Sequence, residues 1–299
     1  MSRSGYQQSI LSGIDVKNLS QSELDSAFLE LLKQGIHGIS FSAYLENQSP
    51  GSIISEEQIE ARMEIIKPYV KWVRSFSCVD GNELIPKIAH KHGLKTLVGA
   101  WLGDDKEKNE EEIESIIKVA KDGDADIVAV GNEVLLRGDL TEDEIIKHIQ
   151  RVKQEIPNVP VGYVDAYYEF VNHPLICSVC DVILANCYPF WEGYPIEHSL
   201  AYLKNMYHLA VTAAKGKKVI VSETGWPNLG SPDRNAVPSY ENALTYFINT
   251  FTWANQENID VFYFASFDET WKIEKEGDVG AYWGLWDKDG NLKFGKANS

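Results

Sequence analysis

The chain alternates between short apolar runs and longer segments in which apolar residues recur with helical spacing. The runs have the length of strands, are rich in β-branched residues and span 35–44, 71–78, 94–103, 125–133, 158–166, 180–188, 217–225 and 259–267. In several of the longer segments an acidic first turn follows a Ser, Thr or Asn, as in Thr141 and the residues after it, which is typical of a helix start. Apolar strands that alternate with helices predict a parallel sheet covered by helices.

The alternation repeats about eight times without a linker, and eight such units close a (β/α)8 barrel. We therefore expect an α/β protein in which residues 1–299 form a single (β/α)8 TIM barrel domain. A doubly wound open sheet is the alternative, but no predicted strand leads into a GxGxxG or GxxxxGK[ST] loop. The pattern is weakest at the short fifth helix, around 167–174, and in the tail, 283–295.

Acidic residues outnumber basic ones, 44 against 28, which gives a formal net charge of -16. A surface of that sign repels phosphate backbones and anionic membranes, so we expect neither nucleic acid nor a membrane as a partner. The hydrophobic share of 44% is that of a water-soluble globular protein. No segment approaches the roughly 18 to 20 consecutive apolar residues of a membrane span.

The cysteines and histidines predict no metal site, and no cofactor is expected. Cys177 and Cys180 have CxxC spacing, but the chain has neither a second such pair nor the His pair that would complete a zinc site. His90 and His92 are two apart on a predicted helix and face different sides. Residues 287–291 open like a calcium loop, but the early Gly and the missing final Glu favour a tight turn.

Two glutamates end apolar runs: Glu133 closes "DIVAVGNE" and Glu223 closes "KVIVSE". The active site of an eight-fold barrel lies at the carboxyl ends of its strands, so both carboxylates are expected at one rim, across its mouth. Two carboxylates across a pocket are what glycosidic cleavage needs, and their separation decides between retention and inversion. A strand-end glutamate can also cap the next helix or pair with a lysine, but two on opposed strands favour catalysis.

The segments around these glutamates resemble glycoside hydrolase family 17, the β-1,3-glucanases and β-1,3-glucanosyltransferases. "VSETGWP" is similar to the nucleophile strand of that family and "VGNE" to its acid/base strand. The resemblance implies that Glu223 is the nucleophile and that Glu133 is first the general acid and then the base. It also implies a (β/α)8 fold and a retaining mechanism. It extends over nearly the whole chain through "VRSFSC", "LVGAWLG", "ANCYPFWEG" and "FASFDETWK". The stretch after Tyr44, "LENQSPGS", looks closer to bacterial than to plant members.

The same resemblance implies substrate-binding residues beside the catalytic pair. It implies that Asn132 holds the sugar 2-hydroxyl and that Tyr188 borders the nucleophile. Tyr44 falls in the segment similar to the first strand of the family. Glu269 and Lys272 keep the Glu-x-x-Lys spacing that the family places next to the catalytic residues.

Physical roles can be argued for several of these residues without the family. Lys272 near Glu223 would favour an ionised nucleophile, whereas Glu133 can act as an acid only if burial and a neighbouring negative charge raise its pKa. Arg74, inside an apolar strand, is expected to be a buried, paired cation near the carboxylates. Tryptophans near strand ends can stack on sugar rings or pack in the rim. The candidates are Trp191, Trp226, Trp271 and Trp283.

The leading hypothesis is a retaining glycoside hydrolase that cleaves laminarin-type β-1,3-glucan by double displacement. A β-1,3-glucanosyltransferase is the nearest alternative, because a sugar can replace water as the acceptor, and a non-catalytic glucan-binding barrel is a further one. The helix after strand six follows its loop directly, so we expect a short, open groove. We expect a monomer with a glucan poly- or oligosaccharide as its partner. Because polymeric glucans are met outside the cytoplasm, a secreted or periplasmic location is expected.

Overall fold

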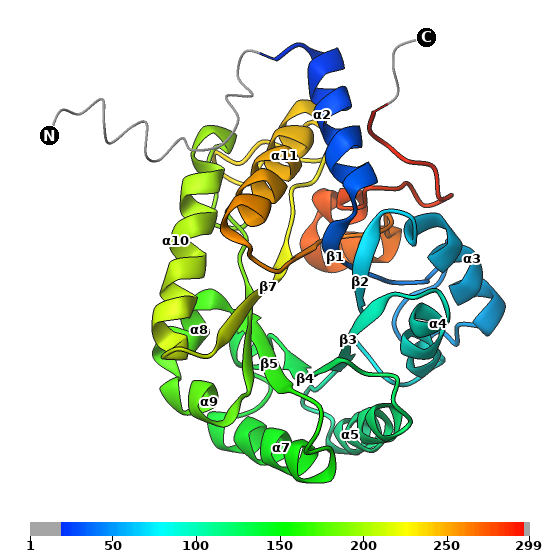
Figure 1. Cartoon of the computed structure of the whole chain (residues 1–299), viewed down its shortest axis with the longest axis vertical. Coiled ribbons are helices and arrows are strands. Elements are labelled where there is room, and N and C mark those ends of the chain that lie inside the picture. Colours follow the sequence, from blue (N-terminus) through cyan, green and yellow to red (C-terminus); the bar gives the residue numbers. More distant parts are fainter. Residues whose placement is uncertain (1–18, 296–299) are drawn as a thin grey trace, which may run out of the picture.

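A computed structural model describes residues 19–295, in which eight parallel strands form a closed barrel in the order β1 to β8 (Figure 1). The barrel closes where β1 pairs with β8, with Gly38 opposite Phe262. The predicted fold class is therefore confirmed. The strands are β1 (Ile36–Ser40), β2 (Val70–Arg74), β3 (Lys95–Ala100), β4 (Ile127–Asn132), β5 (Val161–Ala166), β6 (Val182–Asn186), β7 (Lys218–Thr224) and β8 (Val261–Tyr263).

Helices surround the barrel, and several start with the caps that the sequence predicts. Thr141 forms a capping box with Glu144, and Ser55 and Ser239 accept hydrogen bonds from backbone N–H groups of the first turn. Within residues 19–295 no helix combines the length and the apolar character needed to cross a bilayer. The helices are α2 (Gln21–Gln34), α3 (Glu56–Ile66), α4 (Ile85–Lys91), α5 (Lys106–Lys121), α6 (Val134–Arg137), α7 (Glu142–Glu155), α8 (Tyr167–Asn172), α9 (Pro174–Val179), α10 (Ile196–Ala214), α11 (Tyr240–Glu257) and α12 (Ile273–Glu276), with 3-10 turns η2 (Asn82–Leu84), η3 (Thr270–Lys272) and η4 (Asp278–Tyr282).

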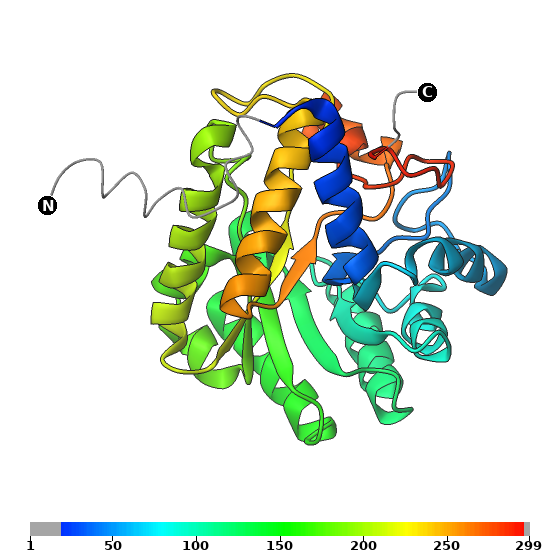
Figure 2. The same cartoon turned by 45° about the horizontal axis from the view of Figure 1, so that its top comes forward.

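All eight predicted strands are present, but each is shorter than its apolar run. The run 35–44, for example, contributes only Ile36–Ser40 to the sheet, and the residues after it belong to the rim. Figure 2 shows the loop after β7 and the segment after β8 at the same end of the barrel. The weak fifth helix is two short helices, because Pro174 lacks the N–H needed to continue α8.

The tail forms the tight turn that the sequence predicts for residues 287–291. The Asp287 side chain accepts hydrogen bonds from the backbone N–H groups of Asp289 and Asn291, at 3.0 and 2.8 Å. The helix after strand six also behaves as expected, because only nine residues, 187–195, separate the end of β6 from α10, which begins at Ile196. The rim therefore keeps only short connections on that side.

The core has two parts, as expected for strands that are buried on both faces. The larger part lies between the helices and the outside of the barrel. The smaller part fills the barrel itself, so the barrel is packed and the open space lies at its rim. Its buried members are Leu97, Ile127, Ala129, Val164, Val182, Leu184, Ile220 and Phe262.

The first and last described segments lie side by side on the outside of the barrel (Figure 1). The rings of Phe28, in α2, and Phe294 meet edge to face with centroids 5.4 Å apart. Asp25 Oδ1 accepts hydrogen bonds from Tyr240 Oη at 2.6 Å and from the backbone N–H of Gly295 at 3.1 Å. These contacts join α2, α11 and the tail into one unit that we call the terminal clamp.

Candidate active site

A cleft of about 350 Å³ opens at the rim formed by the carboxyl ends of the strands. Both predicted catalytic glutamates line it, together with side chains from the loops after β4, β5 and β6 and from the segment after β8. Its lining residues are Glu133, Leu136, Ala166, Tyr167, Tyr168, Asn186, Tyr188, Trp191, Glu192, Glu223, Phe264 and Glu276. The two carboxyl groups thus share one solvent-accessible space.

Glu223 lies near the end of β7 with only 5% of its surface exposed. Gly225 follows closely and lets the chain approach β8, since a Cβ at this position would lie 2.1 Å from the carbonyl oxygen of Phe264. Arg74 Nη1 lies 2.5 Å from Glu223 Oε1, and Tyr188 Oη donates a hydrogen bond to Oε2 at 2.7 Å. A buried cation and a phenol therefore hold the carboxylate in one orientation, as an attacking group requires.

Glu133 follows β4 in the left-handed backbone region, at a φ of 53°. Its backbone N–H donates to Val164 O at 2.8 Å, and its Oε1 accepts a hydrogen bond from Asn186 Nδ2 at 2.8 Å. Ser222 Oγ fixes Asn186 in turn by donating to Asn186 Oδ1 at 2.8 Å. Burial, reinforced by the charge of Glu223, raises the pKa of Glu133 to about 7. Glu133 can therefore carry a proton near neutral pH.

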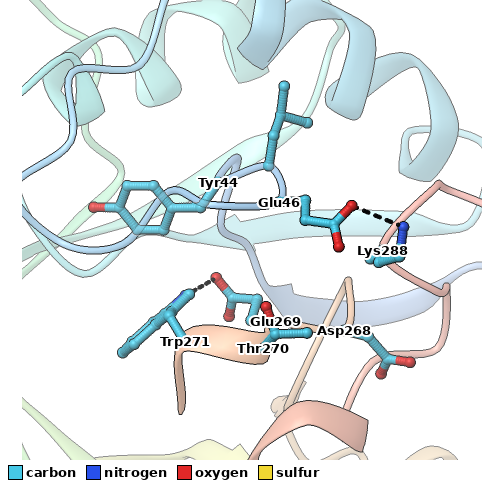
Figure 3. Close-up of a pocket in the computed structure, with 8 residues that line it drawn as sticks. Tyr44, Glu46, Asp268, Glu269, Thr270, Trp271 and Lys288 are labelled. Carbon is cyan, nitrogen blue, oxygen red and sulfur yellow. Dashed lines mark hydrogen bonds and ion pairs between the residues drawn. The ribbon is translucent and has the colours of Figure 1, made fainter. Parts of the chain in front are cut away.

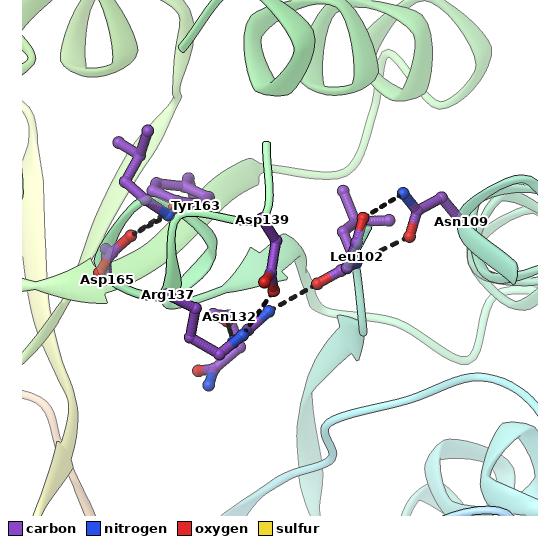
Figure 4. A network of polar contacts seen from close by, with 9 residues as sticks. Leu102, Asn109, Asn132, Arg137, Asp139, Tyr163 and Asp165 are labelled. Atoms are coloured by element: carbon purple, nitrogen blue, oxygen red, sulfur yellow. Dashed lines mark hydrogen bonds and ion pairs between the residues drawn. The ribbon is translucent and has the colours of Figure 1, made fainter. Parts of the chain in front are cut away.

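Asn132 is held between two arginines at the end of β4. Arg74 Nη2 donates to Asn132 Oδ1 at 2.7 Å, and Arg137 donates to the backbone oxygen of Asn132. Arg137 also bonds Leu102 O and Asp139 Oδ2, both at 2.7 Å (Figure 4). Because Arg74 occupies the amide oxygen, the NH2 group of Asn132 is the part that can bind a sugar hydroxyl.

Asp165, in β5, supports the corner that carries Glu133. Its Oδ2 accepts hydrogen bonds from the backbone N–H of Leu135, at 3.1 Å, and from Tyr163 Oη (Figure 4). Its Oδ1 accepts from the backbone N–H of Ala166 at 2.8 Å. Burial raises the pKa of Asp165 to about 6. The carboxyl group thus anchors the first turn of α6 directly after Glu133.

Lys272 has a different partner from the one we expected. Its Nζ lies 2.6 Å from Glu269 Oε2, and Arg74 makes the ion pair with Glu223 in place of Lys272. Lys272 Nζ also lies 4.1 Å from the ring centroid of Phe264, which lines the cleft. Lys272 therefore sits behind the cleft wall, whereas Glu269 lines a separate, smaller hollow. The expectation that Arg74 is a buried, paired cation is confirmed.

Tyr44 and Trp271 line a smaller hollow at the rim, between the segments after β1 and β8. Their rings meet edge to face with centroids 6.2 Å apart, and Figure 3 shows them side by side. Trp271 Nε1 donates to Glu269 Oε1 at 3.0 Å, and Tyr44 Oη accepts from Asn82 Nδ2 at 3.3 Å. Both aromatic side chains are thus held in place at this hollow.

Of the other tryptophans, only some can meet a ligand. Trp191 lines the cleft and is 38% exposed. Trp226 is 1% exposed, packs its ring against Phe190 and donates from Nε1 to Val237 O at 3.0 Å. The prediction that Trp226 binds substrate is therefore wrong, because its ring belongs to the core. Trp283, 2% exposed, is a core residue as well.

Several cleft residues were missed by the sequence analysis. Asn186 ends the sixth apolar run, so the rule that selected the two catalytic glutamates could have found it. Tyr167 and Tyr168 follow the fifth run directly. Glu276 lies in the segment after β8, where no strand ends; burial raises its pKa to about 7, with Lys272 acting in the opposite direction. Only contacts distant in sequence reveal this last residue.

One cluster of side chains in the described part of the chain has the composition of a metal site, but its two glutamates form ion pairs with lysines. Glu60, Glu64 and His92 bring their ligand atoms within 4.8 Å of one another. Lys91 pairs with Glu60, and Lys67 Nζ lies 2.7 Å from Glu64 Oε1. The two ammonium groups already balance the carboxylates. This cluster lies between α3 and α4, and none of its members lines the cleft.

A parallel eight-stranded barrel whose rim cleft holds two carboxyl groups, one of them with its pKa raised to about 7, is typical of glycosidases that use one carboxyl group as acid and the other as nucleophile. Residues 38–284 match the family model of the BtgE/BtgC glycoside hydrolase domain. A glucan 1,3-beta-glucosidase of Arthroderma benhamiae is 29% identical over 268 residues, which cover 82% of this chain and 85% of that protein. A glucan 1,3-beta-glucosidase of Saccharomyces cerevisiae is 25% identical over 281 residues, which cover 86% of this chain and 90% of that protein.

Among solved structures, the glycoside hydrolase family 17 β-1,3-glucanosyltransferase of Rhizomucor miehei superposes with a TM-score of 0.79 at 28% identity. The match covers 88% of this chain and 97% of that one. This protein belongs to the BtgE/BtgC glycoside hydrolase domain family. The resemblance to family 17 that the motifs indicated is confirmed.

Proposed function

We propose that the protein is a retaining glycoside hydrolase that cleaves β-1,3-glucan with Glu223 as nucleophile and Glu133 as acid and base. The observation that carries this proposal is that the two carboxyl groups share one cleft in opposite environments. Glu223 is paired with the buried Arg74, whereas burial raises the pKa of Glu133 to about 7. One group is thus prepared to attack and the other to donate a proton.

In this mechanism Glu223 attacks the anomeric carbon while Glu133 protonates the leaving oxygen, which gives a covalent glycosyl ester. Glu133, now ionised, takes the proton from a water molecule that attacks the same carbon and frees Glu223. Tyr188 keeps the carboxylate of Glu223 oriented throughout. Asn132, held by Arg74, is placed to bind a hydroxyl of the reacting sugar.

The substrate assignment is supported by the relatives, which are glucan 1,3-beta-glucosidases and a β-1,3-glucanosyltransferase. One further relative, from Candida albicans, is a cell surface mannoprotein. We therefore infer that the protein acts on β-1,3-glucan outside the cell. We also propose that it acts as a monomer with one catalytic domain.

The test is the release of reducing sugar from laminarin by wild type, Glu223→Gln and Glu133→Gln. Each substitution removes a group that acts in the chemical step, so we expect turnover to fall by about three orders of magnitude or more. Glu112→Gln is the matched control, because Glu112 is also a buried glutamate whose pKa burial raises to about 7, but it lies outside the cleft. Wild-type turnover in Glu223→Gln would refute the assignment.

A β-1,3-glucanosyltransferase is the second candidate, and the aromatic side chains of the cleft favour it. Tyr167, Tyr168 and Trp191 can bind a second sugar in the position that a water molecule would otherwise occupy. Product analysis with laminari-oligosaccharides separates the two activities, since only transfer yields products longer than the substrate. A non-catalytic glucan-binding barrel would retain binding in all variants and release no sugar in any of them.

A further inference from the structure

Two further carboxyl groups line the cleft beside the catalytic pair. Glu192 lies in the loop after β6, and Glu276 lies in α12, in the segment after β8. Within the described part of the chain, no lysine, arginine or histidine is among the residues that line the cleft. If the proposed function is correct, each unit of the glucan therefore enters a space that is lined by carboxyl groups and by no cation.

Two basic side chains lie behind the cleft wall, and both already have acidic partners. Arg74 Nη1 lies 2.5 Å from Glu223 Oε1, and Lys272 Nζ lies 2.6 Å from Glu269 Oε2. Both cations are buried, with only 1% and 6% of their surface exposed. Neither side chain can leave its partner without leaving a buried charge unpaired, which is costly. An anionic group in the cleft would therefore find neither of these cations free.

The environment of Glu276 indicates that this space disfavours negative charge. Burial raises the pKa of Glu276 to about 7, and the charges of Glu223 and Glu269 act in the same direction, whereas Lys272 opposes them. The pKa of Glu133, which follows β4, is raised to about 7 by burial and by the charge of Glu223. A further negative charge brought between these groups would meet the same burial and the same repulsion.

Glu192 places a carboxyl group on the side of the cleft that the loop after β6 forms. Its backbone N–H donates to Tyr188 O at 3.3 Å. Its side chain shares a hydrogen bond with Tyr167, and this bond, together with burial, raises the pKa of the Tyr167 phenol. Arg234, in the loop after β7, lies in the field of Glu192 but pairs with Asp233 at 3.0 Å. The carboxyl group of Glu192 is thus held at the cleft wall.

We propose that Glu192 and Glu276 are specificity-determining residues that select the glucan by its charge. They admit units that are neutral or carry an ammonium group, and they exclude units that carry a carboxylate or a sulfate. A like charge next to a carboxylate costs free energy, whereas an opposite charge gains it. A β-1,3-glucan with amino substituents is therefore a substrate, and one that contains uronic acid units is a poor one.

The test gives the whole chain three polymers made from one laminarin preparation. One is left neutral, one is oxidised at part of its C6 positions to carboxylates, and one carries an ammonium group at the same fraction of C6 positions. The measured quantity is kcat/KM for the release of reducing ends, relative to the neutral polymer. We expect this ratio to fall about tenfold on the carboxylated polymer and not to fall on the aminated one. Raising the salt from about 20 to about 500 mM should shrink the difference, because screening shortens the reach of the charges.

Glu192→Gln and Glu276→Gln each remove one carboxyl group and keep the size of the side chain. Each should raise the ratio on the carboxylated polymer about threefold, and Glu192→Lys should raise it further. Glu274→Gln is the matched control, because Glu274 is an exposed glutamate of α12 that does not line the cleft. It removes the same formal charge from the protein and should leave the ratio unchanged.

Equal kcat/KM of the wild type on the neutral and the carboxylated polymer would overturn the charge selection and leave the proposed function intact. Equal losses on the carboxylated and the aminated polymer would do the same, because the size of the substituent would then be the cause. An unchanged ratio in both glutamine variants would show that these two residues do not make the selection. A wild-type protein that releases no reducing ends from the neutral polymer would overturn both proposals.

Discussion

Arg74 contacts both the nucleophile Glu223 and the sugar-binding candidate Asn132. Its guanidinium contacts Glu223 with one nitrogen and Asn132 with the other, and only 1% of its surface is exposed. A planar fork of this kind can hold two acceptors at fixed positions, which an ammonium group cannot do. The orientation of the nucleophile and of Asn132 therefore depends on the same side chain.

The first prediction concerns this ion pair. Arg74→Met should lower the free energy of unfolding by about 3–5 kcal/mol, because it leaves the Glu223 carboxylate buried without its cation. Urea denaturation followed by far-UV circular dichroism measures the loss. The double variant Arg74→Met with Glu223→Gln should recover a large part of the lost free energy of unfolding, because no unpaired charge is then buried. Equal losses in the single and double variants would show that charge is not the cause.

The second prediction concerns the dependence of stability on pH. Burial raises the pKa of Glu133 from 4.5 to about 7, so the folded state binds this proton more tightly than the unfolded chain does. Below pH 4.5 both states are protonated. Between pH 4.5 and about 7 only the folded state keeps the proton, so the free energy of unfolding falls as the pH rises through this window and levels off above about pH 7. Glu133→Gln should therefore raise the free energy of unfolding by about 2–3 kcal/mol at pH 8 and by little at pH 4.

Glu155→Gln serves as the comparison for this pH series. The hydrogen bond and charge of Lys121 lower the pKa of Glu155, which is the opposite direction from Glu133. Its removal should bring no gain at pH 8. Thermal unfolding at pH 4, 6 and 8 measures the series, and a gain for Glu133→Gln that is the same at all three values would contradict the assigned protonation.

At the scale of elements, the corner between β4 and α6 places the acid in the cleft. The pairing of β4 with β5 is shifted between Ala129 and Asn132, and Glu133 takes a positive φ. Asp165, on the neighbouring strand, holds the first turn of α6 in position. A residue on one strand thus controls the direction of a side chain on another.

The third prediction tests this support. Asp165→Asn replaces one acceptor oxygen with an NH2 group, and both oxygens of Asp165 face donors. We expect the free energy of unfolding to fall by about 1–3 kcal/mol and kcat on laminarin to fall roughly tenfold, because Glu133 loses its exact placement. Tyr163→Phe removes the hydroxyl that donates to Asp165 and accepts from the backbone N–H of Leu135, but it leaves both oxygens of Asp165 with a backbone donor, so it should have a smaller effect on both quantities. Lost stability with an unchanged kcat would show that the corner does not position the acid.

Sequence pattern predicts elements of this fold well because strands buried on both faces and amphipathic helices leave different periodicities. It predicts their ends poorly. The residues that follow β1 in the run 35–44 are as apolar as the strand, yet they leave the sheet to build the rim. Similarly, Pro174 could have indicated that the fifth helix is divided, since a proline rarely continues a helix.

At the scale of the whole molecule, the sequence pattern predicts which residues reach the rim but not what surrounds each side chain there. The ends of strands locate Glu133 and Glu223, because chain direction fixes the rim on which they lie. Trp226 follows a strand end equally closely, but whether its ring faces sugar or core depends on the surrounding helices. The ion pair of Lys272 could nevertheless have been predicted from the sequence, because Glu269 lies three residues before it, a spacing that brings side chains together in a helical turn.

The fourth prediction concerns the terminal clamp. Phe28 is buried completely and packs against Phe247 and Phe294, with centroids 4.8 and 5.4 Å away. Phe28→Ala should lower the free energy of unfolding by about 3–5 kcal/mol, because it leaves a cavity between three segments. The additional loss from Phe294→Ala in the same chain should be smaller than its loss in wild type. Additive losses in chemical denaturation would show that the two rings are not coupled.

The pairing of β1 with β8 also sets when this molecule can fold during its synthesis. The first strand must wait for residues 261–263 to emerge from the ribosome before its second edge is covered. Until then the nascent chain holds an open sheet with two exposed edges, which can pair with other chains. Chaperones that shield strand edges should therefore matter most for this protein in the last stage of translation.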